Sequence, residues 1–463
     1  MLPMFVSGEV QFSDAKIIAS VRGDTPRVAD LDGDGDTDFL LFANGAIVWY
    51  ANDGKGNWGS RRHIASMSSA ESLFAEDLDG DQNLDILFAT TSSNRIGWFR
   101  NTDGEGNFGS QILISDQLGY ANGVHAADLD GDGDLDALSA SAWDNKIAWY
   151  ENVDGNGSFG DQNIISTLEE QPYEVYADDI DLDGDMDVLS AVRHFNNIVL
   201  YENTDGLGHF EQKQIVTQNQ EYTLQLQMVD LNEDAWPDIL AISGFNDIIA
   251  WYPNLKNGAF GSQHIIKSES PDWDHADSVT GAFAVDLDGD GDLDILGASE
   301  KVDKIFWFER LDEDVIFSDE QIIVTTDQSH KNRQIVSADV DGDGDLDILS
   351  SSLNCIEWYE NLSNTSSVHS NDGIQPKNFK LFQNYPNPFN PSTMISYQLS
   401  INSKVTLEIY NTIGQKVATL VNGWQNAGKH QIQWHVYGLP SGIYLARLQT
   451  EFQIKTMKLV LQK

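Results

Sequence analysis

The sequence has little cysteine, little positive charge and no long hydrophobic run. Its single cysteine, Cys355, excludes an internal disulfide framework. No stretch of 18 apolar residues occurs, so we expect no transmembrane segment. The chain has 27 Lys and Arg residues against 73 Asp and Glu residues, and its net charge of −46 argues against nucleic acid or an anionic membrane as a partner. The first residues lack the basic and apolar regions of a signal peptide, so none is visible.

The chain nevertheless contains ample material for folded domains. Hydrophobic residues make up 41% of it and include 12 Trp, 14 Tyr and 21 Phe, which excludes a disordered chain. The charge is unevenly distributed, because residues 374–463 contain nine basic and two acidic residues while the remainder contains 18 basic and 71 acidic residues. This change and the polar composition of residues 362–378 predict a first domain at residues 1–361, a linker at 362–378 and a second domain at 379–463.

A nine-residue acidic loop recurs seven times in the first domain. The acidic loops begin at Asp30, Asp77, Asp128, Asp179, Asp230, Asp286 and Asp339. An apolar stretch, a short turn and a second apolar stretch follow each loop, and the second stretch usually ends in an aromatic pair such as that of "WYEN" at Trp149. Units of about 50 residues with four short strands each are typical of β-propeller blades. We therefore interpret the aromatic pairs as core between blades.

The two ends of the repeat region complement each other. The seventh unit stops after its third strand at Asn361, whereas Val10–Ser20 reads as a fourth strand without a unit of its own. An N-terminal strand that completes the last blade would close the ring and protect its edges. The sequence therefore predicts an all-β fold with a closed, seven-bladed β-propeller.

The composition of the acidic loops predicts metal binding. Positions 1, 5 and 9 are always Asp, and position 3 is Asp in every loop except at Asn232. Position 6 is Gly except at Gln82 and Ala235, and position 7 varies as far as Trp236, which indicates ligation there through the backbone carbonyl. Several flexible oxygen ligands suit Ca²⁺ better than Mg²⁺. The loops are not EF-hands, because the bidentate Glu at position 12 and the flanking helices are missing.

Up to seven Ca²⁺ ions are therefore expected. The predicted ligands are Asp30, Asp32, Asp34, Asp36 and Asp38; Asp77, Asp79, Asp81, Asn83 and Asp85; Asp128, Asp130, Asp132, Asp134 and Asp136; Asp179, Asp181, Asp183, Asp185 and Asp187; Asp230, Asn232, Asp234, Trp236 and Asp238; Asp286, Asp288, Asp290, Asp292 and Asp294; and Asp339, Asp341, Asp343, Asp345 and Asp347. The fifth loop has one acid fewer and no glycine, so we expect it to bind most weakly, followed by the second loop.

These repeats resemble the FG-GAP and VCBS repeats of integrin-α-like propellers, whose blades carry D-x-D-x-D-G-x-x-D loops between their first two strands. The resemblance covers residues 10–361 and implies the propeller fold and the metal. It does not imply a particular ligand, since proteins with these repeats include adhesion receptors, lectins and polysaccharide-degrading enzymes.

The second domain alternates apolar and polar residues and predicts a small Ig-like β-sandwich. Its segments "NYPNPFNPST", "IYNTIGQKVATL", "GLPSGIYLARL" and "KTMKLVLQK" resemble the type A C-terminal sorting domain of the type IX secretion system. The resemblance implies that the secretion machinery is a partner. It also implies that the protein is secreted or held at the outer cell surface.

A ligand face is expected at the end of the propeller where the turns between second and third strands lie. Its candidate residues are Trp143, Arg193, His194, Trp273 and His275. Aromatic and basic side chains together suit a polysaccharide or a surface protein, so we expect a monomeric, non-catalytic binding or adhesion module. The alternative is a polysaccharide lyase or hydrolase. Arg193 and His194 could supply the cation and base of a lyase, whereas the obvious acids for a hydrolase are already assigned to metal.

Overall fold

The computed structural model describes residues 10–193, 197–217, 223–243, 247–268, 278–300, 303–311, 315–325, 334–363, 380–385, 389, 392–399, 403–411, 416–425, 428–436, 439–440, 442–449 and 454–461. The chain divides into unit 1, Met1–Thr365, and unit 2, Ser366–Lys463. Every regular element in the described residues is a β-strand. Among them there is no helix of the length and apolar character needed to span a membrane.

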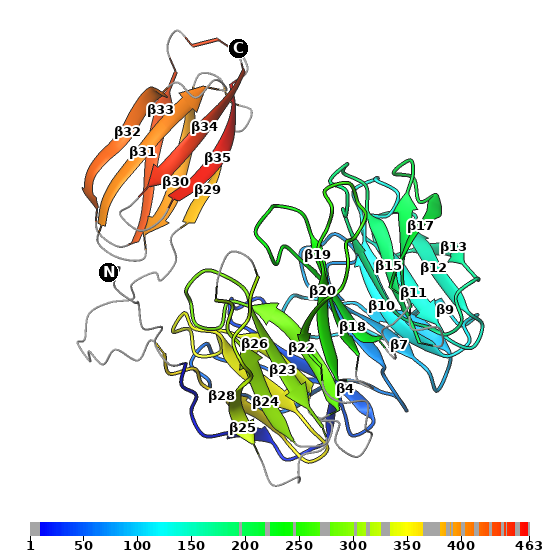
Figure 1. Cartoon of the computed structure of the whole chain (residues 1–463). Coiled ribbons are helices and arrows are strands. Elements are labelled where there is room, and N and C mark those ends of the chain that lie inside the picture. The colour runs from blue at the N-terminus through cyan, green and yellow to red at the C-terminus, as the bar shows by residue number, and fades with distance from the viewer. Residues whose placement is uncertain are drawn as a thin grey trace. The chain divides into compact units, whose positions relative to one another are not determined.

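The described strands of unit 1 form seven four-stranded antiparallel sheets, which we call blades 1 to 7 (Figure 1). Blade 1 contains β2 (Gly23–Ala29), β3 (Asp38–Ala43), β4 (Ala46–Tyr50) and β5 (Arg62–Ser66), and blade 2 contains β6 (Ser72–Glu76), β7 (Asp85–Thr90), β8 (Arg95–Phe99) and β9 (Ile112–Ser115). Blade 3 contains β10 (Ala121–Ala127), β11 (Asp136–Ser141), β12 (Lys146–Asn152) and β13 (Phe159–Ser166), and blade 4 contains β14 (Pro172–Asp178), β15 (Asp187–Val192), β16 (Asn197–Asn203) and β17 (Phe210–Thr217). Blade 5 contains β18 (Thr223–Val229), β19 (Asp238–Ser243), β20 (Ile248–Tyr252) and β21 (His264–Lys267), and blade 6 contains β22 (Val279–Val285), β23 (Asp294–Ser299), β24 (Lys304–Phe308) and β25 (Gln321–Thr325). Blade 7 contains β26 (Gln334–Ala338), β27 (Asp347–Ser351), β28 (Ile356–Tyr359) and β1 (Lys16–Ala19).

The first strands of the blades form a closed ring. Each of these inner strands packs beside the inner strand of the next blade, and β2 contacts both β6 and β26. In blade 7 the outermost strand is β1, which pairs antiparallel with β28 and places Lys16 opposite Trp358. The two ends of the repeat region therefore share one sheet. The sequence prediction of an all-β fold with four strands per repeat is confirmed.

The aromatic pairs of the third strands fill the space between blades, as the sequence predicted. In blade 2, Trp98 is 1% exposed and belongs to the same cluster as Tyr150 of blade 3. Gly157 of blade 3 lies against Trp98 so closely that a Cβ atom there would come within 2.3 Å of the ring, and its φ of +79° also favours glycine. The glycine turn thus permits the close approach of neighbouring blades.

A buried asparagine at the end of the third strand fixes each acidic loop to the following blade. Asn152 Nδ2 donates a hydrogen bond to the carbonyl of Leu78, which is position 2 of the preceding acidic loop, at 2.9 Å. The same contact joins Asn52 to Val340, Asn101 to Leu31, Asn203 to Leu129, Asn254 to Ile180 and Asn361 to Leu287. In blade 6 this position is Arg310, which forms an ion pair at 2.7 Å with Glu233 of the fifth acidic loop. These contacts hold the acidic loops in place around the ring.

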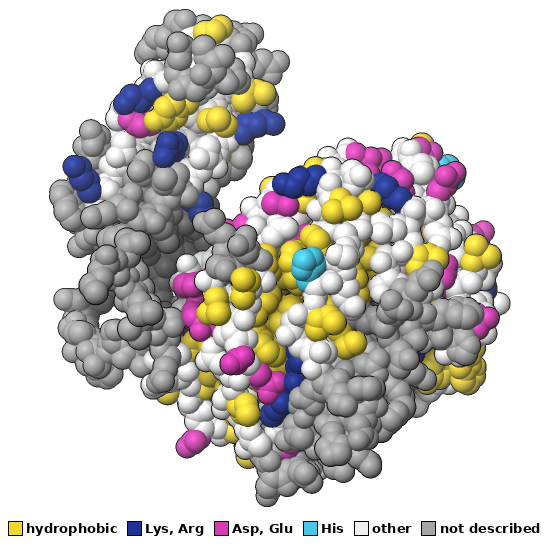
Figure 2. Space-filling model, viewed as in Figure 1, with side chains coloured by type: hydrophobic (Ala, Val, Ile, Leu, Met, Phe, Trp, Pro, Cys, Tyr) yellow, Lys and Arg dark blue, Asp and Glu magenta, His cyan; other side chains and the backbone are white. Residues whose placement is uncertain are grey.

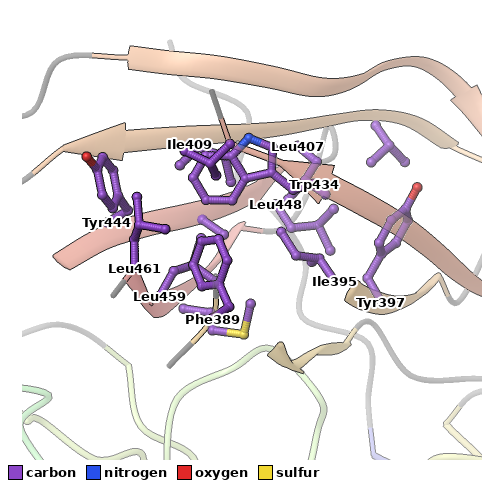
Figure 3. Close-up of a cluster of buried hydrophobic side chains, with 14 residues drawn as sticks. Phe389, Ile395, Tyr397, Leu407, Ile409, Trp434, Tyr444, Leu448, Leu459 and Leu461 are labelled. Carbon is purple, nitrogen blue, oxygen red and sulfur yellow. The ribbon is translucent and has the colours of Figure 1, made fainter. Parts of the chain in front are cut away.

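Unit 2 contains two sheets. One has the order β29 (Lys380–Tyr385), β30 (Ser392–Leu399) and β33 (Gly428–His435), and the other has the order β32 (Lys416–Gln425), β31 (Ser403–Asn411), β34 (Gly442–Gln449) and β35 (Ile454–Leu461). The buried side chains of both sheets form one core, in which Trp434, Leu407 and Leu448 take part (Figure 3). Phe389, from the proline-rich entry segment, is 2% exposed in the same core. The unit has the two-sheet, β-sandwich architecture that the sequence predicts.

Candidate functional site

The acidic loops lie between the first and second strands of the blades and gather their carboxylates. In the third loop, one oxygen each of Asp128, Asp130 and Asp136 lies within 4.8 Å of the others. Similar groups are Asp30, Asp32 and Asp38; Asp77, Asp79 and Asp85; Asp179, Asp181 and Asp183; and Asp286, Asp288 and Asp290. The structure therefore brings together the side chains of positions 1, 3 and 9 or of positions 1, 3 and 5, and these groups could hold a metal ion.

Hydrogen bonds between carboxylates and backbone shape each loop. Asp128 accepts bonds from the N–H groups of Gly131 and Gly133 at 2.8 and 3.1 Å. Gly133 has a φ of +98°, which explains the preference for glycine at position 6. Gln82 and Ala235 take a φ of +72° at the same position, where a side chain causes strain. The position 7 N–H donates to the position 5 carboxylate, as in the 3.1 Å bond from Asp134 to Asp132.

Position 9 has a structural role that the sequence does not reveal. Both oxygens of Asp136 accept backbone hydrogen bonds, from Leu129 at 3.0 Å and from Asn152 at 2.8 Å. The corresponding pair of backbone hydrogen bonds occurs at Asp38, Asp85, Asp238, Asp294 and Asp347. Position 9 thus ties the start of the acidic loop to the end of the third strand, whether or not it also contacts an ion.

The loops contain buried oxygens that lack hydrogen-bond donors, and these fit a cation. They are Asp32 Oδ1, Asp79 Oδ1, Asp134 Oδ1, Asp179 Oδ1, Asp181 Oδ1, Asp187 Oδ2, Asp286 Oδ1 and Asp292 Oδ1. Burial raises the pKa of Asp136 to about 7, and burial together with the charges of Asp132 and Asp130 raises the pKa of Asp134 to about 6. A divalent ion would remove this cost by balancing the charges and occupying the free lone pairs.

Basic side chains from outside the acidic loops already pair with carboxylates of some loops. Arg100 lies 2.6 Å from Asp79 and 3.0 Å from Asp81, both in the second loop. Lys213 lies 3.0 Å from Asp181 in the fourth loop, and Lys256 lies 3.3 Å from Asp234 in the fifth. Within the described ranges, no Lys or Arg forms an ion pair with the third loop. No basic side chain of the described residues therefore offsets the carboxylates of the third loop.

Two of the predicted ligand-face residues are described, and each packs on an aromatic ring that precedes or begins an inner strand. Trp143 is 71% exposed and stacks on Tyr120 with 4.6 Å between ring centroids and an interplanar angle of 18°. The guanidinium carbon of Arg193 lies 3.7 Å from the centroid of Tyr173. His194, Trp273 and His275 lie outside the described residues.

Sequence reasoning missed a cavity of about 470 Å³ inside the ring. All seven inner strands line it, with residues from their beginnings and middles, so the cavity lies toward the end of the strands that is away from the acidic loops. Figure 2 shows apolar side chains gathered toward the middle of the visible face of unit 1, with charged side chains spread around them. The sequence feature that could have indicated this cavity is the occurrence of Arg27, His125 and Glu174 on strands whose other residues predict burial.

Comparison with known families supports the resemblances found in the sequence. The FG-GAP-like repeat matches residues 30–88, 77–139, 128–190, 179–241, 230–297 and 286–350, and the secretion system C-terminal sorting domain matches residues 383–462. Both resemblances are confirmed. The comparison with curated proteins gives no match.

Solved structures include similar folds. A lectin of Agrocybe aegerita, described as recognising non-reducing terminal N-acetylglucosamine, is 19% identical with a TM-score of 0.51, covering 73% of this chain and 87% of the lectin. PorZ, a surface component of the type IX secretion system of Porphyromonas gingivalis, is 10% identical with a TM-score of 0.46, covering 92% of this chain and 58% of PorZ. The lectin likeness shows the fold.

Proposed function

The chain belongs to the family of FG-GAP-like repeat proteins, and from that premise we propose that its propeller is a calcium-stabilised module that binds saccharides outside the cell. The sorting domain at residues 383–462 directs the protein through the type IX secretion system to the cell surface or beyond. Extracellular calcium is plentiful, so sites with dissociation constants on the order of 10⁻⁴ to 10⁻³ M would be filled there.

The observation that carries the saccharide proposal is the exposed aromatic stack of Trp143 on Tyr120. A large aromatic ring held in place by a second ring presents a rigid apolar face, and the C–H face of a sugar ring can pack against it. Arg193, fixed over Tyr173 in the next blade, adds a hydrogen-bond donor for hydroxyl or carboxylate groups. The recognition of terminal N-acetylglucosamine by the lectin indicates one sugar to include in a test.

The test is a glycan array probed with the full chain in calcium, followed by titration calorimetry with the best ligand. We expect Trp143→Ala to weaken binding by roughly tenfold, because the sugar loses its stacking surface. Leu207→Ala removes a 61% exposed apolar side chain from a turn near the acidic loops and should leave the affinity unchanged. Absence of binding to every saccharide would contradict the proposal, and so would equal affinities of Trp143→Ala and the unaltered protein.

The proposed calcium ligands are the carboxylates of positions 1, 3 and 5, with position 9 contributing where its oxygens remain accessible. The ions would balance the negative charge of the loops and brace the hairpins that carry them. We expect the second loop to bind calcium more weakly than every loop except the fifth, because Arg100 already pairs with two of its carboxylates.

We predict that Asp128→Ala destabilises the calcium-bound protein more than Asp230→Ala does. The third loop has all its acids and no basic partner among the described residues, whereas the fifth has Asn232, a strained Ala235 and the Lys256 ion pair. We expect Asp128→Ala to lower the free energy of unfolding by about 1–3 kcal/mol, and Asp230→Ala by less than half as much. Denaturant unfolding in saturating calcium measures both values. The difference should shrink in EGTA, and a larger effect of Asp230→Ala would contradict the ranking.

A further inference from the structure

The cavity inside the ring is built from alternate residues of the inner strands. Residues three before each acidic loop line it, namely Arg27, Phe74, His125, Tyr176, Gln227, Phe283 and Val336. Residues five before each loop also line it, namely Thr25, Ser72, Gly123, Glu174, Gln225, Gly281 and Gln334. A volume of about 470 Å³ lies within the usual range for small-ligand sites. The lining is rich in polar and aromatic side chains, which a purely structural core does not require.

Several of these polar groups have a structural function. Glu174 Oε2 accepts a hydrogen bond from the Leu226 N–H at 2.8 Å, and Gln227 Oε1 accepts one from the Ala284 N–H at 2.8 Å. Gln334 Oε1 accepts a bond from the Thr25 N–H at 2.6 Å. In each case a side chain from one inner strand satisfies a backbone donor on the inner strand of the next blade.

Asn122 is different. Asn122 is one of the residues at the cavity and is only 4% exposed, and its buried Oδ1 and Nδ2 atoms have no hydrogen-bond partner. The register of β10 against β11 shifts between Ala121 and Gly123, so Asn122 sits in a β-bulge. Bulges commonly redirect a side chain at a functional site. A buried amide that can both donate and accept, and does neither, calls for a ligand with hydroxyl groups.

An aromatic band lies farther along the inner strands. His125 is 4.6 Å from Phe74 on one side and 4.6 Å from Tyr176 on the other, measured between ring centroids. Tyr173 occupies the bulge of the next blade, between Pro172 and Glu174. The band gives the cavity an apolar wall suited to a sugar ring, beside a polar mouth suited to its hydroxyls.

The cavity lining contains Arg27 and two acidic residues, Glu71 and Glu174, and Glu174 interacts electrostatically with Arg27. Arg27 has no ion pair within 4.0 Å among the described residues, and its guanidinium donates one bond to the Pro26 carbonyl at 2.8 Å. Burial raises the pKa of Glu174 to about 8, so its carboxyl is mostly neutral at pH 7, and burial lowers the pKa of His125 to about 4. Glu71 also lines the cavity, but its side chain is exposed to solvent and accepts a hydrogen bond from the Thr91 hydroxyl at 2.8 Å. The acidic loops, with their dense negative charge, lie at the opposite end of the inner strands from the cavity.

We propose that this cavity binds the end of an acidic saccharide, with Arg27 pairing with the carboxylate of a uronate sugar and Asn122 bonding its hydroxyls. The inference rests on the proposed saccharide binding and adds to it the place and the charge of the sugar. The ring of strands surrounds the cavity, so a polysaccharide enters it end-on. Arg and carboxylate form strong, directional hydrogen bonds, and a ligand carboxylate would relieve the desolvation of Arg27.

The test is titration calorimetry of the full chain in calcium with a glucuronate trisaccharide and with its neutral, carboxyl-reduced counterpart. We expect the acidic trisaccharide to bind at least tenfold more tightly. Asn122→Ala should weaken its binding at least tenfold, while the melting temperature of the free protein stays the same or rises, because the amide has no partner to lose. Arg27→Gln should abolish the preference for the acidic ligand.

The outcomes separate this inference from the proposed function. If Trp143→Ala weakens saccharide binding and Asn122→Ala does not, the cavity site is wrong and the proposed function stands. Equal affinities for the acidic and neutral trisaccharides overturn the uronate assignment in the same way. If the unaltered protein binds no saccharide at all, the proposed function is wrong and this inference falls with it.

Discussion

Addition of excess EGTA to the calcium-equilibrated protein is expected to lower its melting temperature by on the order of 10 °C or more. At a free calcium concentration ten times the dissociation constant, one site stabilises the folded state by about 1.4 kcal/mol. Five to seven acidic loops together would therefore contribute roughly 7–10 kcal/mol. Without ions, the buried and unpaired oxygens of residues such as Asp32 and Asp286 remain close to other carboxylates. Removal of the ions therefore leaves the loops with the cost of holding buried carboxylates close together.

Differential scanning calorimetry provides the measurement, and readdition of calcium the first control. Magnesium at the same concentration should restore less of the loss, because it prefers a rigid octahedral shell and retains its waters. Unit 2 has no such loops in its described residues and should melt at the same temperature with and without EGTA. A melting temperature of unit 1 that is unchanged by chelation would contradict a structural role for calcium.

The repeated features were the ones that could be predicted from the sequence. Seven acidic loops in phase with apolar stretches predict the strands and the loop positions, because each blade must bury the same faces. The complementary fragments at Val10–Ser20 and Asn361 predict a shared last sheet, and β1 does pair with β28. Trp98 and its counterparts could be assigned to the core because they recur at one position of the unit.

The features of single blades could not be predicted, because they depend on contacts between distant residues. Arg100 follows the third strand of blade 2 and pairs with Asp79 and Asp81 in the loop between the first two strands, and no local sequence pattern reveals this contact. Asn152 recurs at the end of its strand, but its bond to the preceding acidic loop requires knowledge of how blades stack. The isolation of Asn122 became visible only when its neighbours around the ring were known.

The metal-free propeller is expected to become less stable as the pH rises from 5 to 8. Burial raises the pKa of Asp38, Asp85, Asp136, Asp187 and Asp347 to about 7, of Asp294 to about 8 and of Asp238 to about 6. An unfolded aspartate loses its proton near pH 4, so between pH 4 and 7 the folded state binds more protons than the unfolded state. Stability from these groups is therefore complete below about pH 4 and is lost as the pH rises through 7.

Calcium should reverse this slope. The ion binds ionised carboxylates, so its binding releases the protons that the folded, metal-free loops retain, and its affinity grows with pH. Melting temperatures at pH 5, 6, 7 and 8, at constant ionic strength, should fall by on the order of 10 °C in EGTA and rise or stay level in saturating calcium. Curves of the same slope in both conditions would contradict the link between these buried carboxylates and the ion. Opposite pH dependences of the melting temperature in EGTA and in calcium would show that the stability of the propeller depends on the charge of its acidic loops.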